Sequence, residues 1–73
     1  MTHTFNVTVA DKPAVLERLL RVTRHRGFRL QSLNVKSMGD EFSIQLSVDS
    51  EKPAIQLVNQ LDKLYDVITI EQQ

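Results

Sequence analysis

The sequence predicts an α+β domain in which two helices cover one face of a four-stranded antiparallel sheet. Four stretches alternate apolar and polar residues with the period of a strand, and two others carry apolar residues with the period of a helix. Their order along the chain is βαββαβ. A short internal echo supports this layout, because Asp11-Lys12-Pro13-Ala14-Val15 recurs 40 residues later as Glu51-Lys52-Pro53-Ala54-Ile55. Both copies stand where a predicted strand gives way to a predicted helix.

Length and composition indicate one globular domain spanning residues 1–73. The chain is 41% hydrophobic and 25% charged, and no apolar run approaches the roughly 18 residues of a membrane-spanning helix. Nine Lys and Arg residues balance nine Asp and Glu residues, so no net charge draws the protein to nucleic acid or to a membrane. Cysteine is absent, which excludes disulfides and thiolate metal sites. The N-terminus lacks the features of a secretory signal, and we expect a cytoplasmic protein.

The first half of the chain begins with a predicted half-buried strand over residues 4–10. Pro13 then favours a helix start, since the first helical turn does not need its missing N–H, and Asp11 is expected to cap that turn or to complement its dipole. The helix is amphipathic, and its apolar sector holds Val15, Leu16, Leu19, Val22 and Thr23. It ends near Gly27, which can take the left-handed conformation, with Phe28 folding back onto the last turn.

Two further strands, over residues 29–37 and 41–49, flank a Gly39-Asp40 loop that favours a hairpin. If Met38 faces Glu41, the pairing register follows from the loop. One face of the hairpin is then buried, and it carries Gln31, Leu33, Val35 and Ser37 beside Phe42, Ile44, Leu46 and Val48.

The second helix starts at Pro53, and a last strand covers residues 66–71 with Ile68 and Ile70 inward. The apolar sector of the helix holds Ala54, Leu57, Val58, Leu61, Leu64 and Tyr65. With right-handed crossovers, the two halves interleave into a ferredoxin-like sheet of strand order 4-1-3-2. The strand over residues 29–37 is then an edge without proline, and we expect it to pair with a second copy of the chain.

Catalysis finds little support among the residue types present. His3 and His25 are far apart in sequence and have no carboxylate cluster beside them, so surface histidines are the better interpretation, and we expect neither a catalytic residue nor a metal site. An RNA-binding module with the same βαββαβ order is a further interpretation, but such modules stack bases on aromatics of the open sheet face. Phe5 and Phe42 are in phase with the core, so we expect no nucleic acid partner.

Arginines gather on the outer face of the first helix and just beyond it. They are Arg18, Arg21, Arg24, Arg26 and Arg29. One interpretation is a solvated face that includes a weak Glu17–Arg21 pair at i,i+4. The other is a stripe that docks an acidic partner surface, to which the bidentate guanidinium group is well suited. The sequence leaves both interpretations open.

Two segments resemble a known family. Residues 16–28, ending in Arg24-His25-Arg26-Gly27-Phe28, resemble the small regulatory subunit of acetolactate synthase (acetohydroxyacid synthase), most closely the isozyme II type. Residues 61–67 resemble the Leu-x-Lys-Leu-x-Asp-Val segment of that family. The resemblance implies an ACT domain, a βαββαβ regulatory module that pairs through an edge strand and commonly binds amino acids at the dimer interface. It implies a non-catalytic subunit that activates the catalytic large subunit in branched-chain amino acid biosynthesis, with thiamine diphosphate, FAD and Mg²⁺ bound by that partner and no cofactor in this chain.

The resemblance also implies an effector site at the first strand-to-helix turn and the dimer edge. The expected residues are Asp11, Lys12, Ala14, Val15, Leu30 and Gln31. Valine-responsive relatives carry Asn-x-x-Gly in this turn, where the present chain has Asp11 and Ala14 at the outer positions. Asp11 would repel an effector carboxylate, and the Cβ of Ala14 would hinder close backbone approach, so we expect weak binding of branched-chain amino acids. A stand-alone ACT-domain amino-acid sensor is the alternative function.

Overall fold

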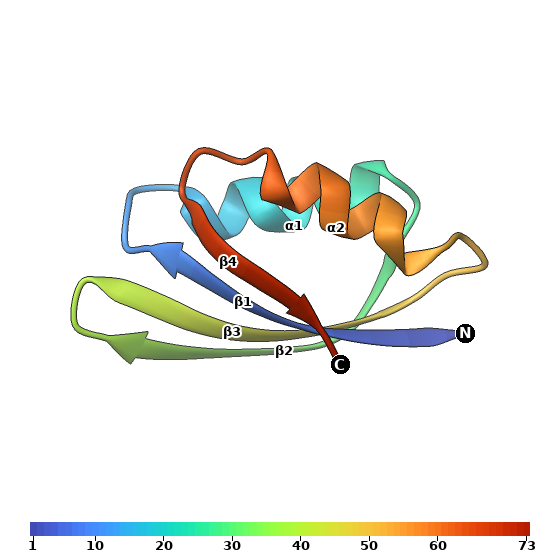
Figure 1. Cartoon of the computed structure of the whole chain (residues 1–73), viewed down its shortest axis with the longest axis horizontal. Coiled ribbons are helices and arrows are strands. Elements are labelled where there is room, and N and C mark those ends of the chain that lie inside the picture. The colour runs from blue at the N-terminus through green and yellow to red at the C-terminus, as the bar shows by residue number, and fades with distance from the viewer.

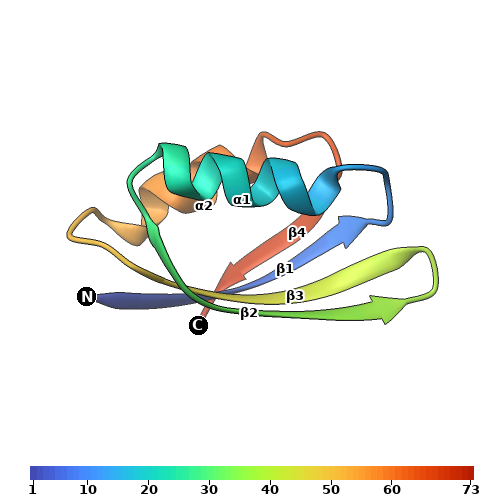
Figure 2. The same cartoon turned by 180° about the vertical axis from the view of Figure 1, so that it is seen from behind.

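The computed structural model describes all residues from Met1 to Gln73 and confirms the βαββαβ order. Its elements are β1 (Thr2–Ala10), α1 (Val15–His25), β2 (Arg29–Met38), β3 (Glu41–Asp49), α2 (Ala54–Asp62) and β4 (Val67–Gln72). The strands form one antiparallel sheet in the order β2-β3-β1-β4, which is the predicted order read from the other edge. Both helices lie over the same face of this sheet (Figures 1 and 2), and its other face is uncovered.

The core lies between the helices and the two central strands. Its buried members are Phe5, Val7, Val9, Val15, Leu19, Phe28, Ile44, Leu46, Val48, Ala54, Leu57 and Leu61. The sheet contributes through β1 and β3 alone, because neither edge strand has a fully buried residue. Two helices are too narrow to cover four strands, so the apolar side chains of β2 and β4 remain partly open to solvent.

The C-terminal end of α1 matches its prediction. Gly27 has a φ of 83°, and Phe28, which is 1% exposed, donates its N–H to the carbonyl of Thr23 at 3.1 Å. These are the contacts of a helix that closes on a left-handed glycine with an apolar residue folded back. The Nζ of Lys52 donates to the carbonyl of Arg26 at 2.8 Å, so the loop before α2 also satisfies this helix end.

The predicted hairpin register is correct from Met38 to Ser32 and wrong beyond it. Met38 faces Glu41 and Leu33 faces Leu46, but Val48 lies opposite Leu30 instead of Gln31, because the register shifts between Leu30 and Ser32. A bulge at Gln31 adds one residue to β2 and reverses the alternation of side chains. The bulge therefore turns Leu30 toward the helices, and Gln31 is exposed.

Two residues near the C-terminus that the sequence predicts to face the core do not do so. Tyr65 is 95% exposed, because α2 ends at Asp62 and the helical period no longer holds there. Ile68 is half-exposed, because the pairing of β4 with β1 shifts between Thr8 and Val9 and leaves Ile68 out of the register. Val67 takes its place against the core, together with Ile70 as predicted.

Candidate functional site

The turn between β1 and α1 forms a shallow hollow of about 250 Å³. Its lining residues are Asp11, Lys12, Ala14, Val15, Leu16, Glu17 and Phe42. The turn is held to the β2–β3 hairpin, because the N–H of Asp11 donates to the carbonyl of Asp40 at 2.9 Å. The side chain of Asp11 makes no capping hydrogen bond, so the predicted cap is wrong, and its exposed carboxylate stands at the rim of the hollow. Four of the six expected effector residues are therefore brought together here.

Ala14 precedes α1 in a left-handed conformation, with φ 65° and ψ 12°. This conformation brings Cβ too close to the following carbonyl oxygen and costs roughly 1–2 kcal/mol in a residue other than glycine. The echoed Ala54 is instead the first residue of α2 and is buried. Position 14 is thus a site at which the backbone favours glycine and the sequence supplies alanine.

The other two expected effector residues lie at the far end of the sheet. Leu30 lines a groove of about 510 Å³ between α1 and β2, and Gln31 is exposed on the bulge. The other residues of this groove are Glu17, Leu20, Arg21, Thr23 and Arg24. Phe42 borders the first hollow and Val48 faces Leu30, so at about 3.3 Å per strand residue Leu30 lies about 20 Å from Phe42, although Glu17 lines both hollows. The six predicted effector residues therefore do not form one site within a single chain.

The arginine stripe is divided among different surroundings. Arg18 donates to the carbonyl of Pro13 at 3.1 Å and lies 3.5 Å from the Oδ2 of Asp66, which joins α1 to the start of β4. Arg21 and Arg24 line the groove beside β2. Arg18 is thus engaged within the fold, whereas Arg21 and Arg24 make no ion pair within the chain.

The remaining two arginines lie off the helix face. Arg26 turns toward α2, and Arg29 lies opposite Asp49 in the sheet. The Met1 ammonium donates to Asp49 at 2.9 Å, and this hydrogen bond is the largest cause of a lowered pKa at Asp49, to which the Arg29 charge adds. The charge of Arg29 is thus partly matched at the sheet end, away from Arg21 and Arg24.

A second groove, lined only by polar side chains, lies between the helices, and the sequence patterns do not predict it. It has a volume of about 320 Å³ and is lined by Arg26, Lys52, Gln56, Asn59, Gln60 and Lys63. Most of these residues form the polar side of α2, which the helical period of the sequence does predict. The helical period does not indicate that the polar side of α2 lies next to Arg26 and Lys52, because that arrangement depends on how α1 and α2 pack.

The open sheet face is polar, as predicted. The hydroxyls of Thr4 and Ser47 lie 3.1 Å apart across β1 and β3, while Phe5 is buried and Phe42 packs against the core. No three His, Cys, Asp or Glu side chains are grouped as a metal site would require. Neither helix has the length and apolar character needed to cross a bilayer.

Comparison with known proteins gives consistent matches. The family model described as "ACT domain" matches residues 11–70. The acetolactate synthase isozyme 2 small subunit of Escherichia coli strain K12 is 44% identical over 69 residues, covering 92% of this chain and 79% of that protein. The acetolactate synthase small subunit of Mycolicibacterium smegmatis is 41% identical over 76 residues, covering 99% of this chain and 44% of the longer relative.

Solved structures show the same fold at low identity. The ACT domain of a GTP pyrophosphokinase from Chlorobium tepidum superposes with a TM-score of 0.87 at 15% identity, covering 100% of this chain and 97% of that one. The small subunit of acetolactate synthase from Thermotoga maritima superposes with a TM-score of 0.82 at 20% identity, covering 99% of this chain and 47% of that one. The βαββαβ arrangement is therefore shared with both.

Replacing Ala14 with glycine tests the left-handed turn. We expect Ala14→Gly to stabilise the fold by about 1 kcal/mol, because glycine adopts the observed φ without steric cost, and thus to raise the melting temperature by about 4–8 °C. The matched control is Ala54→Gly, which should destabilise by about 1 kcal/mol because Ala54 is helical. Thermal unfolding followed by circular dichroism measures both, and equal losses in the two variants would contradict the assigned backbone at Ala14.

Proposed function

Since the chain belongs to the ACT-domain family, we propose that it is a non-catalytic small subunit that binds and activates the catalytic subunit of acetolactate synthase. The observation that carries this proposal is the 44% identity to an isozyme 2 small subunit, which extends over 92% of this chain and 79% of that relative. The enzyme belongs to branched-chain amino acid biosynthesis. Under this proposal thiamine diphosphate, FAD and Mg²⁺ are bound by the catalytic partner.

Homodimerisation through β2 is the second part of the proposal. Leu30, Val35 and Met38 are 39%, 41% and 57% exposed along this strand, and the helices do not reach over it. An edge strand has unpaired N–H and C=O groups, and a strand from a second copy would pair with them while covering the apolar side chains. The sheet would then continue across two chains.

A dimer of this kind would also complete the effector site. The turn that contains Asp11 is hydrogen-bonded to the hairpin at the C-terminal end of β2, whereas Leu30 lies at its N-terminal end. In an antiparallel pair of β2 strands, each N-terminal end meets the C-terminal end of the other copy. Leu30 of one chain would thus approach the turn of the second, and two equivalent sites would form across the interface.

The catalytic subunit is proposed to contact the helical layer. Arg21 and Arg24 are exposed and have no carboxylate partner within the chain, whereas Arg18 is held by Asp66. Unpaired guanidinium groups can form bidentate contacts with carboxylates of a partner without first breaking an internal ion pair.

Co-expression with the catalytic subunit from the same organism tests the main proposal. Wild type should co-purify with that subunit and raise its rate of acetolactate formation, whereas Arg21→Ala with Arg24→Ala should lose both effects. Exposed arginines contribute within about 0.5 kcal/mol to folding, but the loss of desolvated charge pairs can cost roughly 2–5 kcal/mol of binding. Gln45→Ala, on the open face of the central strand β3 and outside the proposed dimer strand, is the control. Failure of wild type to associate would favour the alternative, a stand-alone amino-acid sensor.

A lysine in β2 tests the proposed dimer. We expect wild type to sediment as a dimer at tens of micromolar and Val35→Lys to sediment as a monomer, because Val35 faces Ile44 on the helix-covered side and a lysine there would place a charge among the apolar side chains that the dimer covers. Val35 is already half-exposed, so the melting temperature should change little when compared at the same protein concentration. A wild-type monomer, or an unaltered dimer in the variant, would refute pairing through β2.

Calorimetry with valine tests the effector turn. Wild type should bind valine weakly or not at all, because Asp11 repels the ligand carboxylate at the rim of the hollow. Asp11→Asn with Ala14→Gly should bind valine more tightly, and Ala14→Gly alone separates the effect of backbone access from that of charge. Micromolar affinity in wild type would show that Asp11 does not face the ligand.

A further inference from the structure

The groove between α1 and α2 has an unusual lining. Every residue around it is a cation or a carboxamide, and no apolar or acidic side chain contributes: Arg26, Lys52, Gln56, Asn59, Gln60 and Lys63. We call these six residues the interhelical groove. In a chain with zero net charge, this is a local concentration of positive charge. Glu51 and Asp62 are sequence neighbours of two of the lysines, but they do not line the groove.

Lys52 is held in position by the fold. Its ammonium donates to the carbonyl of Arg26 at 2.8 Å, at the C-terminal end of α1. A Cβ on Gly27 would stand 3.0 Å from the same nitrogen, so the absent side chain of Gly27 leaves room for the ammonium. A lysine ammonium has three N–H donors, and two of them remain for a ligand. The positive charge is thereby preorganised at one end of the groove.

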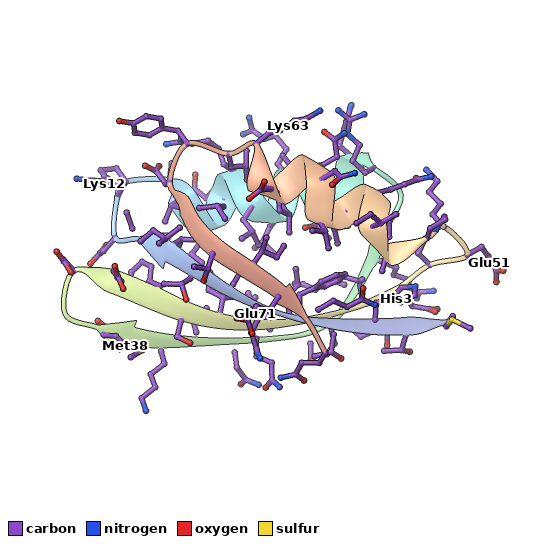
Figure 3. The ribbon with its side chains drawn as sticks, in the orientation of Figure 1. His3, Lys12, Met38, Glu51, Lys63 and Glu71 are labelled. Carbon is purple, nitrogen blue, oxygen red and sulfur yellow. The ribbon has the colours of Figure 1, made fainter.

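The other charges of the groove are available for binding. The ion pairs of the chain are Met1–Asp49 and Arg18–Asp66, so Arg26, Lys52 and Lys63 have no carboxylate within ion-pair distance. A second hollow of about 320 Å³ continues the groove past Arg26, Gln60 and Lys63, toward Arg21 and His25. Figure 3 shows Lys63 on the helical side of the molecule, away from the sheet. Cations from α1 and α2 therefore border both hollows on the outer layer, and Val22 and Leu64 complete the lining of the second one.

We propose that the interhelical groove binds an extended acidic peptide segment of the catalytic subunit. The choice of this partner rests on the function proposed above. Cations spaced along a groove match carboxylates spaced along a chain. The three carboxamides both donate and accept hydrogen bonds, so they can pair with the N–H and C=O groups of a peptide backbone. None of the six groove residues has an aromatic side chain on which a nucleic acid base could stack, and His25 of the adjoining hollow is the single aromatic ring nearby.

The interhelical groove and the hollow at the β1–α1 turn are suited to different ligands. A branched-chain amino acid needs an apolar surface for its side chain, and none of the six groove residues offers one. The residues also lie on the outer side of the helices, so occupation of the groove and pairing of β2 are compatible. One chain can therefore use the groove and the sheet edge at the same time.

Charge reversal at Lys63 tests this proposal, with Gln45→Glu as the control that adds a carboxylate on the open face of the central strand β3. Association of each full-length variant with the catalytic subunit is measured by calorimetry from about 50 mM to about 400 mM NaCl. We expect Lys63→Glu to weaken association at least roughly ten-fold and to reduce its salt dependence, and Gln45→Glu to stay within about two-fold of wild type. Arg26→Gln with Lys63→Gln repeats the test without adding a carboxylate, and melting curves verify the fold.

Competitors identify the chemistry of the occupant. A short peptide of alternating glutamate and serine should displace the catalytic subunit from wild type, and a lysine-serine peptide or inorganic phosphate should not. Equal association of Lys63→Glu and wild type, or no displacement by the glutamate peptide at millimolar concentration, would overturn the proposal. Stronger displacement by single-stranded RNA would assign the groove to nucleic acid, and a changed sedimentation of Lys63→Glu alone would assign it to a second copy of this chain. If wild type does not bind the catalytic subunit at all, the proposed function fails before the groove is tested.

Discussion

Two helices cover only the middle of a four-stranded sheet, and the other features of this molecule depend on that geometry. Phe5, Leu46 and Val48 are completely buried because β1 and β3 run beneath the helices. The core is complete once these two strands are covered, so β2 has apolar side chains that stabilise the single chain little. Burial of apolar surface is the main driving force for association. The uncovered strand is therefore the physical basis of the proposed dimer and of an effector site shared between two chains.

Two local features adapt the regular layout to this geometry. The bulge at Gln31 rotates Leu30 to the helical side, which extends the apolar strip of β2 by one residue beyond the regular alternation. Four residues before the bulge, Gly27 allows α1 to close in a left-handed turn and leaves space for Lys52. The same glycine therefore ends a helix and makes room for one cation of the interhelical groove. The helix end and the proposed binding site are coupled through one position.

The internal echo illustrates the limit of local sequence reasoning. Asp11-Lys12-Pro13-Ala14 and Glu51-Lys52-Pro53-Ala54 have nearly the same residues, yet Ala14 is left-handed and exposed whereas Ala54 is helical and buried. Lys52 is hydrogen-bonded to the end of α1, while Lys12 lines the hollow at the β1–α1 turn. The difference follows from what each turn packs against: the first is hydrogen-bonded to the hairpin at Asp40, and the second lies against the end of α1.

The sequence by itself determined the order of elements, the sheet order, the Gly39-Asp40 hairpin and nearly all of the core, because period-two and helical patterns record which side of each element is buried. The family resemblance led to a predicted effector site of six residues, of which Asp11, Lys12, Ala14 and Val15 line one hollow. Tertiary structure alone decided the bulge at Gln31, the exposure of Tyr65, the pairing of Arg18 with Asp66 and the convergence of Arg26 with Lys63. These features depend on contacts between residues distant in the chain, and hydrophobic periodicity contains no information about which polar sides of two helices come to face each other.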